Sequence, residues 1–229
     1  MVEARGRGII VAIDGPAAAG KSSTAAEVAD RLGYVHLDTG ALYRAVTLAL
    51  IRADRPEGGW GTLDRAALDD LGIDARLGGS GLRIHVRGTP VDDALRAPAV
   101  NAGVSRVAAV PAVRDWALDR LRAIGAEGGL VADGRDIGTV VFPGAELKVF
   151  LVCDPEERAR RRLLQMGEAV DDSSLREEAA RLRERDRLDT EREVAPLLRA
   201  ADAVLLDTTF QDFEAQVEAI VRLARARSR

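Results

Sequence analysis

A glycine-rich segment between an apolar run and a helical pattern constrains the fold of this chain more than any other feature. Residues 15–22 read Gly-Pro-Ala-Ala-Ala-Gly-Lys-Ser and fit the pattern G-x-x-x-x-G-K-[ST]. The apolar residues 8–13 precede it, and residues 25–32 follow with helical periodicity up to Gly33. In such a strand–loop–helix unit, the loop N–H groups and the helix N-terminus face a bound phosphate. The segment therefore predicts a phosphate-binding loop in an α/β fold.

The side chains of this loop indicate a nucleotide phosphate with a metal ion. Lys21 would contact the β- and γ-phosphates, and Ser22 would ligate Mg²⁺. Lysine occurs only at Lys21 and Lys148, so 31 of the 33 basic residues are arginine. Because an ammonium group is more compact than a guanidinium fork, a lysine at this position indicates a need for a compact charge. The pattern alone does not choose between a kinase, an ATPase and a GTPase.

Five short apolar runs alternate with segments of helical periodicity, which predicts a parallel five-stranded sheet flanked by helices. The runs are residues 8–13, 34–37, 130–132, 147–152 and 203–206. They lead into Asp14, Asp38, Asp133, Asp154 and Asp207. Ligands of open α/β sheets lie outside the carboxyl ends of the strands, so these acids indicate an edge that handles metal or phosphate. We expect Asp154 to cap a helix and Asp207 to lie in a turn.

Residues 56–103 interrupt this alternation. Residues 63–71 predict a helix, and residues 73–77 and 82–87 alternate apolar and polar side chains around the turn at 78–81, which is typical of a β-hairpin. We therefore expect a small subdomain at 56–103, inserted into a core formed by residues 1–55 and 104–229. Further helices are predicted at residues 99–109, 112–126, 156–166, 175–187 and 213–227.

Two of these helices are rich in arginine. The arginines are Arg158, Arg160, Arg161, Arg162, Arg181, Arg183, Arg185, Arg187 and Arg192. We expect most of them to form ion pairs with acidic residues three or four positions away on solvated helices. Some should reach phosphate, because guanidinium groups neutralise the charge of a transferring phosphoryl group. The segment 156–188 is accordingly predicted to be a helical lid.

Two shorter motifs add candidate ligands. Residues 133–138, Asp-Gly-Arg-Asp-Ile-Gly, place three charges at the expected ligand edge, and Asp133 is predicted to bind Mg²⁺ through water. Thr39 is expected to cap the helix after the second strand, which would leave Arg44 one turn inside it and able to hold an acceptor phosphate. We interpret His36 and His85, the only histidines, as structural, because they lack the spacing of metal ligands.

Composition excludes several other classes. A net charge of −4, a pI of about 5.4 and 3% aromatic residues disfavour a nucleic-acid partner. No run approaches the ~18 apolar residues that a membrane span needs, and the apolar run 9–13 is too short for a signal peptide. Cys153 has no partner for an internal disulfide and is expected to pack as a small apolar residue. We expect a cytoplasmic monomer that contacts no membrane.

Five segments resemble the bacterial cytidylate kinase family: IDGPAAAGKSS, LDTGALYR, VSRVAAVPAVR, ADGRDIGTVVFP and RERDRLDTEREVAPL. They cover most of the chain, and the last two are more specific than the phosphate loop. The resemblance implies a P-loop sheet with an inserted NMP-binding subdomain and a lid. It also implies transfer of the γ-phosphate of ATP to CMP or dCMP with Mg²⁺ and without a covalent intermediate.

The resemblance implies a role for each matching position. Arg44, Arg135, Arg185 and Arg192 would hold the CMP phosphate or neighbouring groups; Ser105, Arg114 and Asp136 would bind the cytosine edge; and Asp189, with Arg185, would contact the sugar. Catalysis would fall to Lys21, Arg135, Arg162 and Arg185, and metal binding to Ser22 and Asp133. ATP would lie against Gly15, Pro16, Ala17, Ala18, Ala19, Gly20, Lys21, Ser22, Ser23, Arg158 and Arg161.

The sequence departs from the family pattern at two positions. Thr39, an expected substrate ligand, stands where many members have serine, and it keeps the hydroxyl group. Ser22 stands where related kinases often have glycine before a threonine, so Ser22 and Ser23 are alternative Mg²⁺ ligands.

Three other functions remain as alternatives: a kinase for UMP or shikimate, a regulatory module that only binds ATP, and an RNA-binding protein that uses the arginine-rich helices.

Overall fold

The computed structural model of the chain describes residues 8–78 and 81–228, so the middle of the expected hairpin turn, residues 79–80, lies outside the described residues. The strands are β1 (Ile10–Asp14), β2 (Val35–Asp38), β3 (Ile73–Gly78), β4 (Gly81–Val86), β5 (Thr89–Pro90), β6 (Leu130–Gly134), β7 (Leu147–Val152) and β8 (Val204–Asp207). The α-helices are α1 (Lys21–Leu32), α2 (Thr39–Arg52), α3 (Arg65–Asp69), α4 (Pro98–Ala108), α5 (Pro111–Gly125), α6 (Pro155–Met166), α7 (Asp172–Glu191) and α8 (Phe213–Arg227). Short 3₁₀ helices span Glu57–Thr62 and Asp92–Arg96, and a π-helical turn spans Ile137–Val141.

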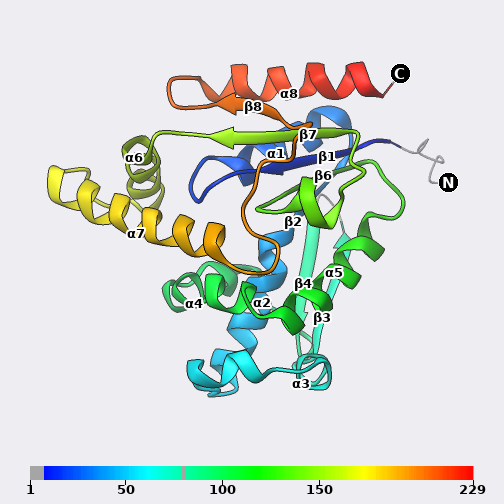
Figure 1. The fold of residues 1–229 in the computed structure, drawn as a ribbon, viewed down its shortest axis with the longest axis vertical. Coiled ribbons are helices and arrows are strands. Elements are labelled where there is room, and N and C mark those ends of the chain that lie inside the picture. Colours follow the sequence, from blue (N-terminus) through cyan, green and yellow to red (C-terminus); the bar gives the residue numbers. More distant parts are fainter. Residues whose placement is uncertain (1–7, 79–80, 229) are drawn as a thin grey trace.

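The central sheet of the described chain has five parallel strands in the order β2-β6-β1-β7-β8. Val11 and Ile13 of β1 pack against a cluster that includes residues of α1 and α8, whereas Ala12 faces the cluster formed with α2, α4 and α5. Figure 1 shows α8 above the sheet and the second group of helices below it. The expected five-stranded parallel sheet flanked by helices is therefore confirmed.

Strand order places the candidate site. β1 lies between β6 and β7, and the chain from β1 to β2 passes over β6. The strand order reverses beside β1, so a crevice opens outside the carboxyl ends of β1 and β6. Asp14 and Asp133 lie at these two ends.

Two helix starts differ from the expectations. Asp38, not Thr39, caps α2, and its carboxylate accepts a hydrogen bond from the N–H of Ala41. Thr39 lies inside the first turn and donates its hydroxyl hydrogen to the carbonyl of Asp133, so the predicted cap was wrong. Helix α7 begins at Asp172, three residues before the expected start, because Asp171 and Ser174 form a capping box. The predicted cap at Asp154 is confirmed. Asp207 is the last residue of β8, and its carboxylate accepts hydrogen bonds from the N–H and hydroxyl of Thr209 in the turn that follows.

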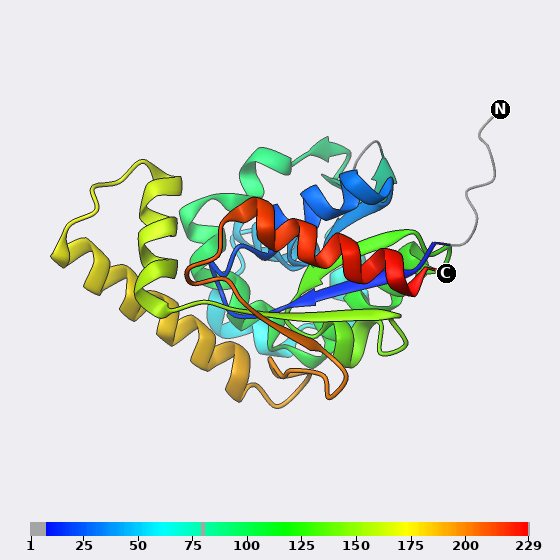
Figure 2. The ribbon, with the colours of Figure 1, turned by 90° about the horizontal axis from the view of Figure 1, so that it is seen from above.

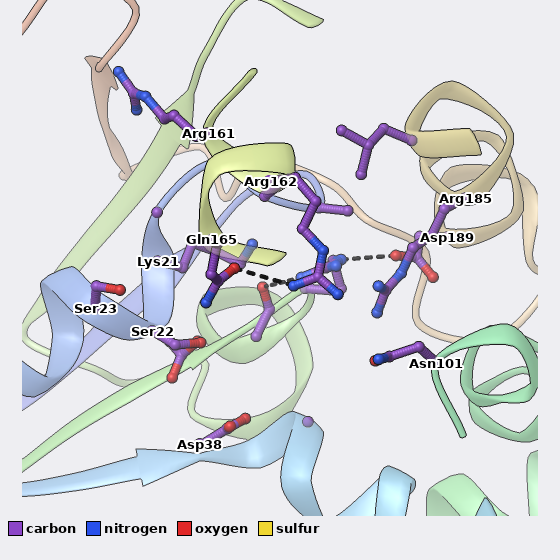
Figure 3. Close-up of a pocket in the computed structure, with 18 of the residues that line it drawn as sticks. Lys21, Ser22, Ser23, Asp38, Asn101, Arg161, Arg162, Gln165, Arg185 and Asp189 are labelled. Atoms are coloured by element: carbon purple, nitrogen blue, oxygen red, sulfur yellow. Dashed lines mark hydrogen bonds and ion pairs between the residues drawn. The ribbon is translucent and has the colours of Figure 1, made fainter. Parts of the chain in front are cut away.

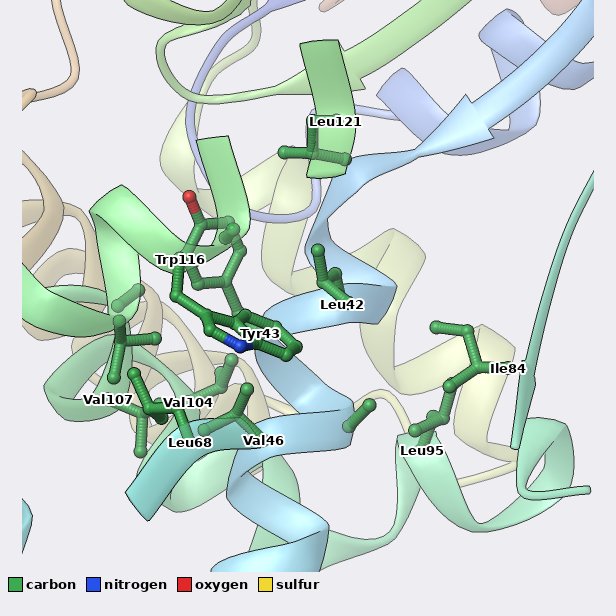
Figure 4. Close-up of a cluster of buried hydrophobic side chains, with 14 of the residues drawn as sticks. Leu42, Tyr43, Val46, Leu68, Ile84, Leu95, Val104, Val107, Trp116 and Leu121 are labelled. Atoms are coloured by element: carbon green, nitrogen blue, oxygen red, sulfur yellow. The ribbon is translucent and has the colours of Figure 1, made fainter. Parts of the chain in front are cut away.

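Strands β3 and β4 pair as the predicted hairpin, and the short strand β5 pairs with β4. The pairing runs from Ile73 opposite Val86 to Gly78 opposite Gly81. Ile84 of this sheet belongs to the same buried cluster as Leu42 and Trp116, so the segment shares a core with α2 and α5. Figure 4 shows this cluster around α2.

Helices α6 and α7 pack on each other and extend beyond the sheet on one side (Figures 1 and 2). Gly167 ends α6 in a left-handed conformation, and residues 168–171 lead into α7. No helix in the described ranges is long and apolar enough to cross a membrane.

Candidate active site

A cleft of about 880 Å³ opens at the carboxyl ends of β1, β2 and β6. Its walls come from the start of α1, from α2, α4, α6 and α7, and from the loop after β8 (Figure 3). The residues expected from the sequence that line it are Ala17, Ala18, Gly20, Lys21, Ser22, Ser23, Thr39, Arg44, Ser105, Arg114, Asp133, Arg135, Asp136, Arg161, Arg162, Arg185, Asp189 and Arg192. The other expected residues, Gly15, Pro16, Ala19 and Arg158, do not line the cleft, although Arg158 bonds the carbonyl of Ala17 in the phosphate loop.

The phosphate loop owes its shape to two glycines. Gly15 has a φ of 150°, and a Cβ atom there would lie 2.4 Å from the carbonyl oxygen of Leu151, so a side chain cannot fit. Gly20 is left-handed at a φ of 85° and immediately precedes α1. The Lys21 ammonium turns back to donate to the carbonyl of Pro16 at 2.5 Å. Burial, together with the charge of Arg135, lowers the pKa of Lys21 well below its usual range.

Ser22 and Asp133 form a pair of oxygen ligands beside Lys21. The Ser22 hydroxyl donates to Oδ2 of Asp133 at 2.6 Å, and Oδ1 of Asp133 lies 2.8 Å from Nε2 of His36. Burial would raise the pKa of Asp133, but the bonds from His36 and Ser22 and the charge of Lys21 outweigh it and lower the pKa. A hydroxyl beside an ionised carboxylate fits a hard divalent cation such as Mg²⁺. Ser23 is exposed and makes no such contact with Asp133 in the described structure.

A buried polar network forms the end of the cleft near α4 and α5. Arg114 donates to Oδ2 of Asp136, and Arg192 donates to Oδ1 at 3.3 Å. Both arginines and the aspartate are at least nine-tenths buried. The Arg114 guanidinium also lies over the Tyr43 ring, 5.3 Å from its centroid. The network therefore presents both hydrogen-bond donors and an acceptor in a fixed arrangement.

Four cations converge between this network and the phosphate loop: Lys21, Arg44, Arg135 and Arg185. Arg135 donates to Asp189 at 2.7 Å. The Nε atoms of Arg44 and Arg185 are buried without a hydrogen-bond partner among the described residues. Burial and the charge of Arg135 lower the pKa of Arg185 to about 10. Figure 3 shows Arg162 from α6 and Arg185 from α7 reaching into the space opposite Lys21 and Ser22.

The charge of the cleft is opposite to that of the chain. Among the described residues, ten lysine or arginine side chains line it against six carboxylates, whereas the whole chain carries −4. Buried cations held close together repel one another unless anions enter. The unpartnered Nε atoms of Arg44 and Arg185 add to this demand. The cleft is therefore built for a ligand with several negative charges.

The three expected lid arginines lie in different surroundings. Arg158 is only 4% exposed, and its guanidinium donates to the carbonyls of Cys153 and Ala17 and to Asp186. Arg161 lines the cleft edge and donates to the carbonyl of Thr208 at 2.6 Å. Arg162 donates to the exposed Gln165 and points into the cleft. Arg158 is thus held entirely by protein atoms in this conformation.

Several cleft residues were missed from the sequence. Asn101 and Arg96 line the cleft, and Arg96 donates to Asp38 at 3.3 Å. His36, expected to be structural only, does not line the cleft but bonds Asp133, which does. The loop residues 209–213 form the far end, where the Phe210 side chain is fully exposed and Oε1 of Gln211 is buried without a partner among the described residues. Of the residues named here, only Asp38 was indicated by the sequence, because it directly follows a predicted strand.

Comparison with known proteins assigns the chain to a family. A family model described as "Cytidylate kinase" matches residues 11–226. A protein named cytidylate kinase from Pseudomonas aeruginosa is 50% identical over 93% of this chain and 93% of its own length, and one from Salinibacter ruber is 42% identical over 95% and 97%. The crystal structure of an uncharacterized protein from Eubacterium ventriosum shares the fold, with a TM-score of 0.51 and 12% identity over 96% of this chain and all of its own. With a family model that spans nearly all of its length and relatives this similar, the chain belongs to the cytidylate kinase family.

Proposed function

We propose that this protein transfers the γ-phosphate of ATP to CMP and dCMP. The observation that carries the proposal is that one cleft joins a phosphate loop to a buried Arg114–Asp136 pair. A phosphate loop alone fits any nucleotide-binding protein. The buried pair at the other end adds a second, polar pocket for an acceptor.

The buried network matches the edge of cytosine. Cytosine presents an amino group that donates hydrogen bonds, and a ring nitrogen and a carbonyl oxygen that accept them. Asp136 would accept from the amino group, while Arg114 and the Ser105 hydroxyl would donate to the ring acceptors. Uracil presents an acceptor in place of the amino group and would face the Asp136 carboxylate unfavourably, which leaves a buried acceptor unpaired.

The cationic middle of the cleft matches the phosphates. We propose that Arg44, Arg135 and Arg192 hold the acceptor phosphate, and that Asp189 with Arg185 contacts the sugar. Thr39, bonded to the Asp133 carbonyl, would border the acceptor. Lys21, Arg135, Arg162 and Arg185 would surround the transferring group. In-line transfer needs positioning and charge neutralisation rather than a covalent intermediate, and these side chains supply both.

The phosphate loop would hold the phosphates of ATP, with Ser22 and Asp133 as the ligands of Mg²⁺. When bound between Ser22 and Asp133, Mg²⁺ would supply positive charge that offsets the charge of the ATP phosphates. His36 would keep the Asp133 carboxylate turned toward Ser22, since it bonds the other carboxylate oxygen. Arg161, together with the loop 209–213, would border the base of ATP, for which the exposed ring of Phe210 offers a stacking surface.

The two helices α6 and α7 would act as a lid over both nucleotides, from about residue 156 to 188, and residues 56–103 would act as the inserted nucleotide-binding subdomain. Closure would exclude water, which otherwise competes with the acceptor for the γ-phosphate. Because a single chain lines the entire cleft, we propose that a monomer suffices. Its unpaired Cys153 suits the reducing cytoplasm, where we propose that it works.

An acceptor panel tests the proposal. ADP formation from ATP would be measured with CMP, dCMP, UMP, AMP and shikimate in a coupled assay. We expect CMP and dCMP to give by far the highest kcat/KM. A preference for UMP or shikimate would reject the assignment of the base pocket. ATP binding without acceptor-dependent turnover would indicate a regulatory module, and salt-dependent retention of RNA on a filter would indicate an RNA-binding protein.

A further inference from the structure

A largely buried ion pair between Arg158 of α6 and Asp186 of α7 has no part in the proposed chemistry. We propose that this pair positions the tip of the phosphate loop for ATP and fixes the position of the loop relative to the arginines of α7. The inference rests on the proposed function, because it takes the loop as the ATP phosphate site. Arg158 and Asp186 are then positioning residues that act through the backbone of Ala17.

The contacts of the pair converge on one residue of the loop. Oδ1 of Asp186 accepts a hydrogen bond from the N–H of Ala17 at 2.8 Å. Nη1 of Arg158 donates to the carbonyl of Ala17 at 2.9 Å and to Oδ2 of Asp186 at 2.5 Å. Both backbone polar groups of Ala17 are thus held by the same ion pair. A further bond from Nε of Arg158 to the carbonyl of Cys153, at 3.1 Å, ties the pair to the end of β7.

The loop needs this support because its own sequence does not favour its shape. Ala18, directly after the held residue, is left-handed at a φ of 57°. A residue with a Cβ adopts that conformation at a cost and keeps it only where its surroundings impose it. Ala17 also packs in a small buried cluster with Ala159 of α6 and Leu182 of α7. The two helices therefore impose the loop conformation from outside.

The same pair sets the place of an arginine that faces the phosphates. Arg185 precedes Asp186 in α7, and its unpartnered Nε is buried within the described part of the cleft. Because α7 is rigid between these adjacent residues, bonding Asp186 to Ala17 fixes Arg185 relative to Lys21. Phosphoryl transfer is sensitive to such placement, since displacement by about 1 Å can cost about a hundredfold in rate.

Other ion pairs in α6 and α7 lack these contacts and serve as controls. Arg187 and Glu184 form an exposed pair at 2.8 Å in α7, with both side chains more than half exposed. By contrast, the side chains of Arg158 and Asp186 are 5% and 18% exposed. Asp186→Asn is therefore matched by Glu184→Gln, and Arg158→Met by Arg187→Met.

A double variant distinguishes an effect of the pair on the position of the phosphate loop from an effect on the stability of the fold. Removing one partner leaves a buried charge unpaired and destabilises the fold, whereas replacing both partners with apolar residues of similar volume often restores stability. The double variant Arg158→Met/Asp186→Leu should therefore recover the Tm lost in the single variants. It cannot restore the bonds to Ala17. Its Kd for ATP should stay at least about tenfold above that of the wild type, because the phosphates meet a displaced loop.

Three measurements are made on each variant: the Tm, the Kd values of Mg·ATP and of CMP by calorimetry, and hydrogen exchange of a peptide that covers residues 15–23 in the nucleotide-free protein. We expect faster exchange and weaker ATP binding in the double variant, a change in the Kd of CMP below about threefold, and wild-type values for both control variants. CMP binding changes less than ATP binding because, apart from Arg185, its proposed contacts, including the base pocket of Arg114 and Asp136, have no bond to Ala17 in the described structure.

Two results would overturn the inference. One is a double variant that regains wild-type ATP affinity together with its Tm, because the pair would then act only on stability. The other is an equal loss of ATP affinity in Glu184→Gln. If the wild-type protein itself fails to bind ATP, the proposed function is rejected, and the inference with it. The titration of the wild type alone distinguishes this result from the other two.

Discussion

Lys21 is surrounded by the charges of Arg135, Asp133, Arg185 and Asp186, in a site that burial makes unfavourable for any cation. We expect Lys21→Arg to fold normally and to lose kcat/KM by about a hundredfold or more, because a planar guanidinium cannot fit where the ammonium bonds Pro16 at 2.5 Å. Steady-state kinetics and circular dichroism check both parts. Turnover near that of the wild type would reject the assignment of the phosphate loop.

Asp136 is the acceptor of the base pocket, held between Arg114 and Arg192. Asp136→Ala should raise the KM for CMP far more than that for ATP. The loss of a buried acceptor leaves unpaired groups at a cost of about 1–3 kcal/mol, which corresponds to a roughly 5- to 150-fold change. The two KM values decide the matter, and equal increases would show that Asp136 does not bind the base.

At the scale of elements, Asp14 joins β1 to the π-helical turn 137–141 by accepting the N–H groups of Ile137 and Gly138, both at 2.8 Å. Burial raises the pKa of Asp14 from 3.8 to about 6. The Asp14 carboxyl therefore ionises at a lower pH in the unfolded chain than in the folded one. The stability that protonated Asp14 contributes below pH 4 is lost as the pH rises through about 6.

The side chain introduced by Asp14→Asn cannot ionise. The unfolding free energy of the variant should therefore rise relative to that of the wild type between pH 4 and pH 7. The difference in unfolding free energy between the two proteins should shift in favour of the variant by on the order of 2–3 kcal/mol across that range. Urea unfolding at several pH values measures it. All other titrating groups are shared by the two proteins, so a difference that stays constant with pH would show that Asp14 does not titrate there.

Helices α6 and α7 are the second pair of elements for which we make a prediction, that they close over bound nucleotides. Their inner part is bonded to the phosphate loop through Arg158 and Asp186, whereas Arg162 has only the exposed Gln165 as a partner among the described residues. We expect hydrogen exchange in residues 160–178 to slow most when ATP and CMP analogues bind together, and less with either alone. Arg162→Ala should lower kcat more than it weakens CMP binding. Unchanged exchange with a bisubstrate inhibitor would show that these helices do not close.

At the scale of the whole molecule, an acidic chain encloses a basic cleft. A polyanion should therefore stabilise the nucleotide-free protein by relieving repulsion among the buried cations. Tripolyphosphate should raise the Tm by several degrees over sodium chloride at equal ionic strength. Arg185→Met should lose most of this gain. An equal gain in the wild type and the variant would place the anion outside the cleft.

The sequence by itself determined the elements and the chemistry of the loop. Period-two and helical patterns, strand-end aspartates and G-x-x-x-x-G-K-[ST] depend on neighbours within a few residues, so they survive without knowledge of the fold. They predicted the five strands of the sheet and the main helices, and most of the expected site residues line one cleft. The start of α7 was missed by three residues because the capping box of Asp171 and Ser174 was not recognised.

Only the tertiary structure decided which side chains meet. Arg158 and Arg162 lie one turn apart on the same helix, yet one is bonded to the phosphate loop and the other points into the cleft. The packing of α6 against α7 and the loop sets that difference, and no local pattern records it. His36 reaches Asp133 only because β2 pairs with β6, a strand more than ninety residues later. Such contacts depend on the order of strands in the sheet and on helix packing, which are set by burial across the whole chain rather than by neighbouring residues.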